Sequence, residues 1–174
     1  MLDHASKRAP APSRSASSRH VAAYAACAWA LIFAVPSFVW AAGVDLGTET
    51  IAADVDAAGI ADPMLLAVTG VLKVLAGLVA LALVRPWGRR IPRRLLLVAA
   101  WGAAAFFLVY AVVNLVDHGL MEAGARSIPE ELGADAVRWH LLLWDPWWLL
   151  GGILFAVAAW QFSRASAASV RWAS

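Results

Sequence analysis

Four long apolar segments constrain the fold of this chain more than any other feature of its sequence. They cover Val21–Ala42, Pro63–Val84, Leu95–Val116 and His140–Phe162. A helix needs about 20 residues to cross a hydrocarbon core of about 30 Å, and each segment reaches that length. Backbone amides in lipid must be bonded within the protein, and helices achieve this within a single segment. The sequence therefore predicts an all-α, polytopic membrane protein that forms a four-helix transmembrane bundle.

The composition supports the same class of protein. The chain has 174 residues, 62% of them hydrophobic, and a mean hydropathy of +0.70, which is too apolar for a soluble domain of this length. Uninterrupted apolar runs do not match the alternating pattern of strands in a membrane barrel. Cys27 is the single cysteine, so the sequence predicts neither an intrachain disulfide nor a cysteine-based metal cluster.

Charged residues outside the four segments are sorted by loop. Eleven of the fourteen Lys and Arg residues lie before Val21, in the 85–94 loop or after Phe162, whereas most acids lie in the 43–62 and 117–139 loops. Short basic loops face the cytoplasm in membrane proteins. The sequence therefore predicts a plasma-membrane protein with both termini cytoplasmic (N-in/C-in). This sorting also explains the net charge of +2, so no nucleic-acid partner is predicted.

Three regions are expected along the chain. Residues 1–20 are rich in Ala, Ser, Pro and Arg and predict a disordered basic tail, residues 21–162 form the transmembrane domain, and residues 163–174 form a cytoplasmic tail. A signal peptide cleaved after Val39-Trp40-Ala41 is the alternative for the first segment, but its apolar run is long for that role. The bilayer is the expected partner, and the cytoplasmic arginines are candidates for contact with anionic lipids.

Lys73 and Asp145 are the two charged residues well inside the segments, and they are candidate site residues for that reason. An unpaired charge at this depth costs a few kcal/mol at least, and such residues face the bundle interior. Small residues at helical spacing from Lys73, such as Gly70 and Gly77, indicate a close helix contact on its side. We therefore predict an ion pair between Lys73 and Asp145, or one polar cavity that holds both.

Asp145 has a second interpretation. It precedes Pro146, and an acid followed by proline is typical of a helix N-cap with proline at the first helical position. In that case the membrane helix begins at Pro146, and residues 138–144 lie along the interface. A cap and a buried ion pair are equally compatible with the sequence.

The outer half of the third segment carries further polar residues at helical spacing. Together with His140 and the tryptophans near Asp145, they predict a polar cavity that opens outward. The candidate ligand-binding residues are Lys73, Tyr110, Asn114, Asp117, His118, His140, Trp144, Asp145 and Trp148. Helix-to-helix hydrogen bonding without a ligand is the alternative for the same residues. No sequence motif for a metal, haem or other cofactor is present, so none is predicted.

The chain has ten tryptophans. Several lie near the ends of the segments, where an aromatic belt at head-group depth is their ordinary role. Trp144, Trp147 and Trp148 follow i, i+3, i+4 spacing, so inward stacking is the alternative for these three.

Three stretches resemble one family. These stretches are Trp139–Gly152 (WHLLLWDPWWLLGG), Gly70–Gly77 (GVLKVLAG) and Leu83–Gly88 (LVRPWG). They resemble an uncharacterised actinobacterial family of small integral membrane proteins, classed as a domain of unknown function. The resemblance extends over roughly Ala22–Phe162 and implies a four-helix membrane protein. It implies no catalytic or binding residue.

Three functions are compatible with these features. The first is binding of a small or lipophilic ligand, or help in its transport, in an outward-facing polar cavity. The second is a structural or accessory bundle without a ligand, and the third is a membrane enzyme acting on a lipophilic substrate. The sequence has no nucleophile elbow, P-loop or zinc motif, so an enzyme is the least favoured. Four helices are few for a transporter, so transport would require a homo-oligomer.

Overall fold

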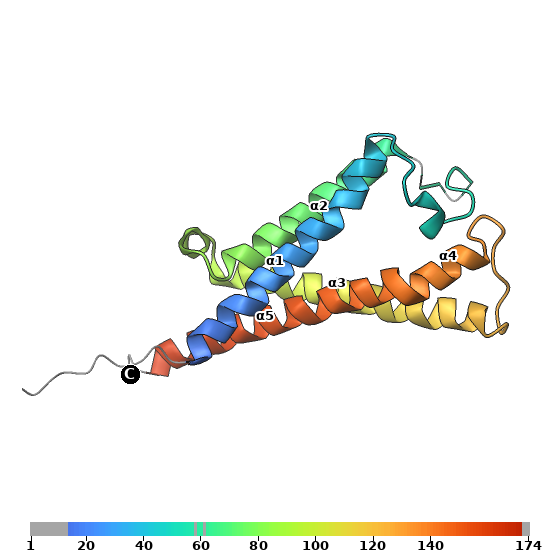
Figure 1. The fold of residues 1–174 in the computed structure, drawn as a ribbon. Helices are drawn as coiled ribbons and strands as arrows, with labels where there is room; N and C mark the ends of the chain where they lie inside the picture. The colour runs from blue at the N-terminus through green and yellow to red at the C-terminus, as the bar shows by residue number, and fades with distance from the viewer. Residues whose placement is uncertain (1–13, 58, 61, 172–174) are drawn as a thin grey trace, which may run out of the picture.

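The chain folds into two helical hairpins, as a computed structural model shows (Figure 1). The structure describes residues 14–57, 59–60 and 62–171. The helices are α1 (Arg14–Ala41), α2 (Pro63–Ala82), α3 (Arg93–Glu122), α4 (Ala134–Trp139) and α5 (Asp145–Arg171), with a π-helical turn, η3 (His140–Trp144), between α4 and α5. Two short 3-10 helices, η1 (Thr48–Thr50) and η2 (Pro86–Arg90), lie in the connections. No β-strand occurs in the described residues, and the predicted all-α fold is confirmed.

Each hairpin pairs two long antiparallel helices. The first consists of α1 and α2, and the second consists of α3 and the continuous helix formed by α4, η3 and α5. The hairpins lie against each other near the chain termini and spread apart toward the other end (Figure 1). Within the described residues, four helical stretches are long and apolar enough to cross a membrane. The predicted set of four transmembrane helices is therefore confirmed.

The helix bounds differ from those expected from hydropathy. The first helix begins at Arg14, and the last ends at Arg171, so each extends into a predicted tail. Residues 1–13 and 172–174 of those tails lie outside the described residues. The third helix ends at Glu122, six residues beyond its predicted end. Its last turns are buried at His118 and Met121, because there α3 packs against the helix formed by α4, η3 and α5. Hydropathy finds the lipid-crossing part of a helix, whereas polar residues extend the helix beyond it.

Small residues bring α1 and α2 together. An ideal Cβ built on Gly77 would lie 3.5 Å from the Cβ of Ala30, and one on Gly70 would lie 2.9 Å from the ring of Phe38. Ala30 is fully buried in this interface. Close backbone approach of this kind stabilises helix pairs in lipid, where the hydrophobic effect does not drive helices together and van der Waals packing must do so.

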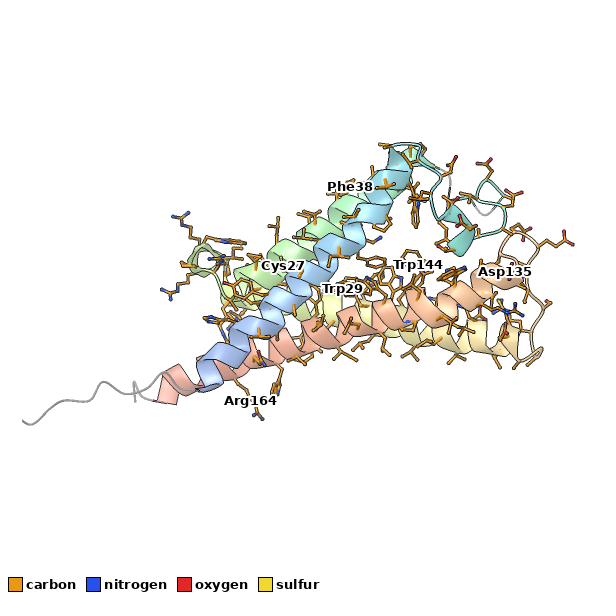
Figure 2. All side chains as sticks on the ribbon, in the orientation of Figure 1. Cys27, Trp29, Phe38, Asp135, Trp144 and Arg164 are labelled. Carbon is orange, nitrogen blue, oxygen red and sulfur yellow. The ribbon has the colours of Figure 1, made fainter. Side chains whose placement is uncertain are left out.

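A cluster of aromatic rings joins the two hairpins. Trp29 of α1 is its centre: the ring lies 5.1 Å from that of Phe107 and 6.3 Å from that of Trp147, measured between centroids. The Trp29 indole also donates a hydrogen bond to the carbonyl oxygen of Trp147 at 2.9 Å. Figure 2 shows Trp29 and Trp144 between α1 and α5. This cluster fixes the angle at which the hairpins meet.

The loops at the spread end also bind each other. The amides of Ala53 and Asp54 donate to the carbonyl oxygens of Leu132 and Glu131, at 2.9 and 3.0 Å. The Trp144 indole donates to the carbonyl oxygen of Thr50 at 3.1 Å. The first hairpin's loop is thus attached to the second hairpin where the helices themselves have separated.

Candidate functional site

Lys73 extends from α2 into a ring of aromatic and hydroxyl groups contributed mostly by α1. Its ammonium donates a hydrogen bond to the Ser37 hydroxyl at 2.7 Å. It lies 3.9 Å from the ring centroid of Phe33 and 5.9 Å from that of Trp148. The side chain is half-buried, whereas Ser37 is buried. The ring faces and the hydroxyl partly replace the water that the cation loses.

The predicted ion pair between Lys73 and Asp145 is not formed. In the described residues no carboxylate lies within ion-pair distance of Lys73, and the carboxylate of Asp145 is bound by His118. The physical reason is the order of the helices: α1 packs against both α2 and α5 and lies between them. A lysine on α2 therefore contacts mainly side chains of α1, and its ammonium approaches the ring of Trp148 on α5 and not the carboxylate of Asp145.

His118 and Asp145 form a buried pair within the second hairpin. The Nδ1 atom of His118 donates to Oδ2 of Asp145 at 2.7 Å, and Asp145 is 1% exposed. The second carboxylate oxygen, Oδ1, is also buried and has no hydrogen-bond partner in the described part of the chain. An acid at this depth is costly unless a donor meets it, and His118 from α3 supplies that donor.

The N-cap interpretation of Asp145 is wrong. The helix does not begin at this residue but continues through it from Ala134, and Asp145 has helical dihedral angles of −68° and −44°. Pro146 has no amide hydrogen and would clash with the carbonyl group four residues earlier in a regular helix. The π turn over His140–Trp144 widens the helix just before this proline. The helix thus passes the proline without ending.

His140 lies beside the buried pair. Its ring centroid is 4.5 Å from that of His118, and its Nδ1 atom donates to the carbonyl oxygen of Ala136 at 2.8 Å. This bond leaves Nε2 as the free ring nitrogen of His140. In the described residues no group of three or more His, Cys, Asp or Glu side chains is arranged to hold a metal ion.

The remaining predicted residues of α3 do not form one polar stripe. The Asn114 side chain donates to the carbonyl oxygen of Tyr110 on its own helix, at 2.8 Å. Asp117 forms an ion pair with Arg126. The Tyr110 ring lies 4.5 Å from that of Trp148, between centroids. The structure therefore brings the candidates together in two groups, one at Lys73 and one at His118, rather than around one cavity.

Trp144, Trp147 and Trp148 turn inward. All three are half-buried and pack on the central aromatic cluster, and Trp148 meets the edge of Phe33 at 4.7 Å between centroids. Inward stacking, the less favoured sequence interpretation, is therefore the one observed for these residues. Trp139 and Trp160 are more exposed, at 45% and 46%, which suits a belt position.

The partners of Lys73 are not predictable from the sequence alone. Ser37 and Phe33 are four residues apart, on one face of the first helix, and neither carries a charge that marks it as a site residue. A buried hydroxyl in an otherwise apolar helix was the available signal. The Ser37 hydroxyl points to Lys73 only once it is known that α1 lies next to α2.

One family model matches the chain. It is described as "Protein of unknown function (DUF3995)" and matches residues 30–155, which include both groups of site residues. No curated protein and no solved structure matches the chain.

Proposed function

We propose that this chain, which belongs to the family of proteins of unknown function DUF3995, binds an acidic lipophilic molecule between its two hairpins. The site is the ammonium of Lys73 with the aromatic rings around it. We further propose that the protein lies in the plasma membrane with both termini in the cytoplasm. Four helices of membrane-crossing length make it a multi-pass membrane protein.

The orientation is supported by the separation of charge between the two ends of the structure. The turn between α2 and α3 carries three arginines and the first two residues of α3 are also arginines, with no acid among them, whereas the connections at the spread end carry most of the acids. Asp135 and Arg164, labelled in Figure 2, lie at opposite ends of the second hairpin. Arginine-rich short loops remain in the cytoplasm.

This orientation predicts the behaviour of fusions to Ser174. A fluorescent protein that folds only in the cytoplasm should fluoresce when it is fused there, and alkaline phosphatase should be inactive. The same phosphatase inserted after Gly124, in the turn that follows α3, should be active because the acidic loop lies outside. The reverse pattern would contradict the proposed topology.

One observation carries the binding proposal: Lys73 has a positive charge inside a membrane helix and only neutral partners. A lysine at this depth costs a few kcal/mol, on insertion scales. Ser37 and the ring of Phe33 reduce that cost without neutralising the charge. Only one hydrogen bond from its three ammonium donors is made within the described residues, to Ser37. An anionic group would complete this site.

The surroundings of Lys73 select for an apolar ligand body. Phe33, Trp144 and Trp148 form one face of the site, and the ring of Phe33 lies 6.1 Å from that of Trp144 and 4.7 Å from that of Trp148, measured between centroids. A strongly hydrated anion would lose its water without receiving other hydrogen bonds here. A single carboxylate or phosphate on a hydrocarbon chain meets both requirements, since its chain can remain among the rings or in the bilayer.

Quenching of tryptophan fluorescence tests this proposal, because bromine quenches indoles at short range. We expect dibromostearate to quench the fluorescence of the purified protein saturably. Lys73→Met should raise the half-saturation concentration about tenfold, which corresponds to a loss of about 1.4 kcal/mol of binding free energy. Lys73→Arg should keep most of the binding because it keeps the charge. The matched ligand control is the methyl ester of dibromostearate, which should quench the native protein and Lys73→Met alike. Equal binding of the acid by both proteins would refute the proposal.

A purely structural role for Lys73 is the second candidate, and the hydrogen bond to Ser37 favours it. In that role the ammonium fixes the register of α1 against α2, and methionine at position 73 would change only the stability of the hairpin. The two roles are distinguished by measuring thermal unfolding of Lys73→Met beside the quenching titration. Changed stability with unchanged binding would support the structural role alone.

A further inference from the structure

A second site lies away from Lys73, at the end of the molecule where all four membrane helices meet the turn after α2. A cavity of about 700 Å³ opens there. Its polar lining residues are His20, Arg85, Arg89, Arg90, Arg93 and Gln161. The turn and the helices α1, α3 and α5 therefore contribute basic or amide groups to one space.

The positive charge of this cavity is not compensated by the protein. Every acid in the described residues lies in the 45–62 or 117–135 stretches or is Asp145, and none of these lines the cavity. Arg93 donates one bond to the carbonyl oxygen of Ser163 at 3.3 Å, and Arg85 lies over the ring of Tyr24. Arg89 and Arg90 form no ion pair with any described carboxylate. Four guanidinium groups thus share a space that no acidic side chain of the described residues lines.

The floor of the cavity is apolar and holds one unsatisfied amide. Buried Leu83, Leu96 and Ala158 form part of that floor. The side-chain carbonyl oxygen of Gln161 is buried and accepts no hydrogen bond within the described part of the chain. A ligand that brings a hydroxyl donor to this oxygen and an anion to the arginines would satisfy both.

The backbone of the turn is shaped to keep this cavity open. Gly88 of η2 is buried, and a Cβ at this position would lie 1.9 Å from the carbonyl oxygen of Ala82. Glycine therefore lets the turn fold back onto the end of α2, which places Arg89 and Arg90 at the rim. Setting the orientation in the membrane needs only basic charge in this loop. A cavity of this form also needs the close contact between Gly88 and the end of α2.

We propose that this cavity binds the phosphate group of an anionic lipid whose head group carries a free hydroxyl, as in phosphatidylglycerol. Guanidinium groups bind phosphate oxygens through paired hydrogen bonds. The apolar floor favours a lipid over a free phosphate because the acyl chains can follow the helix surfaces into the bilayer. The cavity lies at the arginine-rich end, so this inference does not depend on the ligand at Lys73.

The test compares two double variants that remove the same charge. Arg89→Gln/Arg90→Gln alters the cavity, and Arg94→Gln/Arg164→Gln removes two arginines at the same end that do not line it. Binding of phosphatidylglycerol to the purified, delipidated protein is measured by native mass spectrometry. We expect the first double variant to lose about tenfold or more in affinity and the second less than about threefold. Phosphatidylcholine, which is zwitterionic, should bind all three proteins weakly.

Two further results would overturn the proposal in different ways. Equal losses in both double variants would mean that diffuse charge, and not the cavity, attracts the lipid. Displacement of phosphatidylglycerol by an equal concentration of inorganic phosphate or glycerol phosphate would mean that the site recognises a free phosphate. Arg89 and Arg90 are exposed, so their substitution should leave the fold intact, which the tryptophan emission of each variant verifies.

Discussion

Replacement of His118 by leucine is expected to lower the free energy of unfolding by about 3 kcal/mol. The change removes the donor to Asp145 and leaves a carboxylate unpaired at a position that is 1% exposed. Breaking a buried pair by removing one partner typically costs about 3–5 kcal/mol, and a lone acid in lipid costs about 3 kcal/mol on insertion scales. The effect should be visible in reversible unfolding in mixed micelles, followed by circular dichroism.

Two controls define the cause of that loss. The double variant His118→Leu/Asp145→Val removes both polar groups and should recover most of the lost stability, because apolar replacement of a whole buried pair is often nearly neutral. Glu122→Gln removes an exposed partner of Arg138, 3.3 Å away in the same hairpin, and should cost less than about 1 kcal/mol. A double variant as unstable as His118→Leu would show that packing, and not the unpaired charge, is responsible.

Gly151→Ala is expected to destabilise the contact between the hairpins by about 1–3 kcal/mol, the usual cost of overpacking a core. A Cβ at this position would lie 2.2 Å from the indole of Trp29. That ring is held in place, since its nitrogen donates a hydrogen bond to the carbonyl oxygen of Trp147 and the rings of Phe33 and Phe107 pack against it at steep angles. The midpoint of thermal unfolding should therefore fall.

Gly102→Ala is the matched control for this prediction. Gly102 lies in α3, also within a membrane helix, but a Cβ there would meet nothing within 4 Å. Its stability should stay the same or rise slightly, because alanine favours helix over glycine. Equal destabilisation by both substitutions would contradict the role assigned to Trp29 in joining the hairpins.

The number and type of membrane helices could be predicted from the sequence because a bilayer imposes a length on every apolar segment. Those four segments sufficed for the all-α fold. The burial of a polar residue near Asp145 could also be expected, since an acid in lipid needs a donor. The identity of that donor could not be predicted. Either His118 or Lys73 could reach Asp145, depending on which helices are neighbours, and the sequence does not give the order of the helices.

The rest of the site depends on features that have no sequence period. The π turn before Pro146 carries the helix past a residue that usually ends one, so the N-cap interpretation was reasonable and wrong. Ser37 is a single hydroxyl in an apolar helix and gains meaning only from the Lys73 ammonium 2.7 Å away. Hydropathy reports exposure to lipid, whereas these contacts depend on which helices are neighbours.

The most direct test of the proposed function is to identify what the protein carries from the cell. The native chain and Lys73→Met would be purified in the same detergent, and their bound small molecules compared by mass spectrometry at equal total lipid. We expect a set of lipophilic acids with one negative charge to accompany the native protein and to be lost from Lys73→Met. The same acids bound in equal amount to both proteins would contradict the central claim that the Lys73 ammonium receives an anionic ligand.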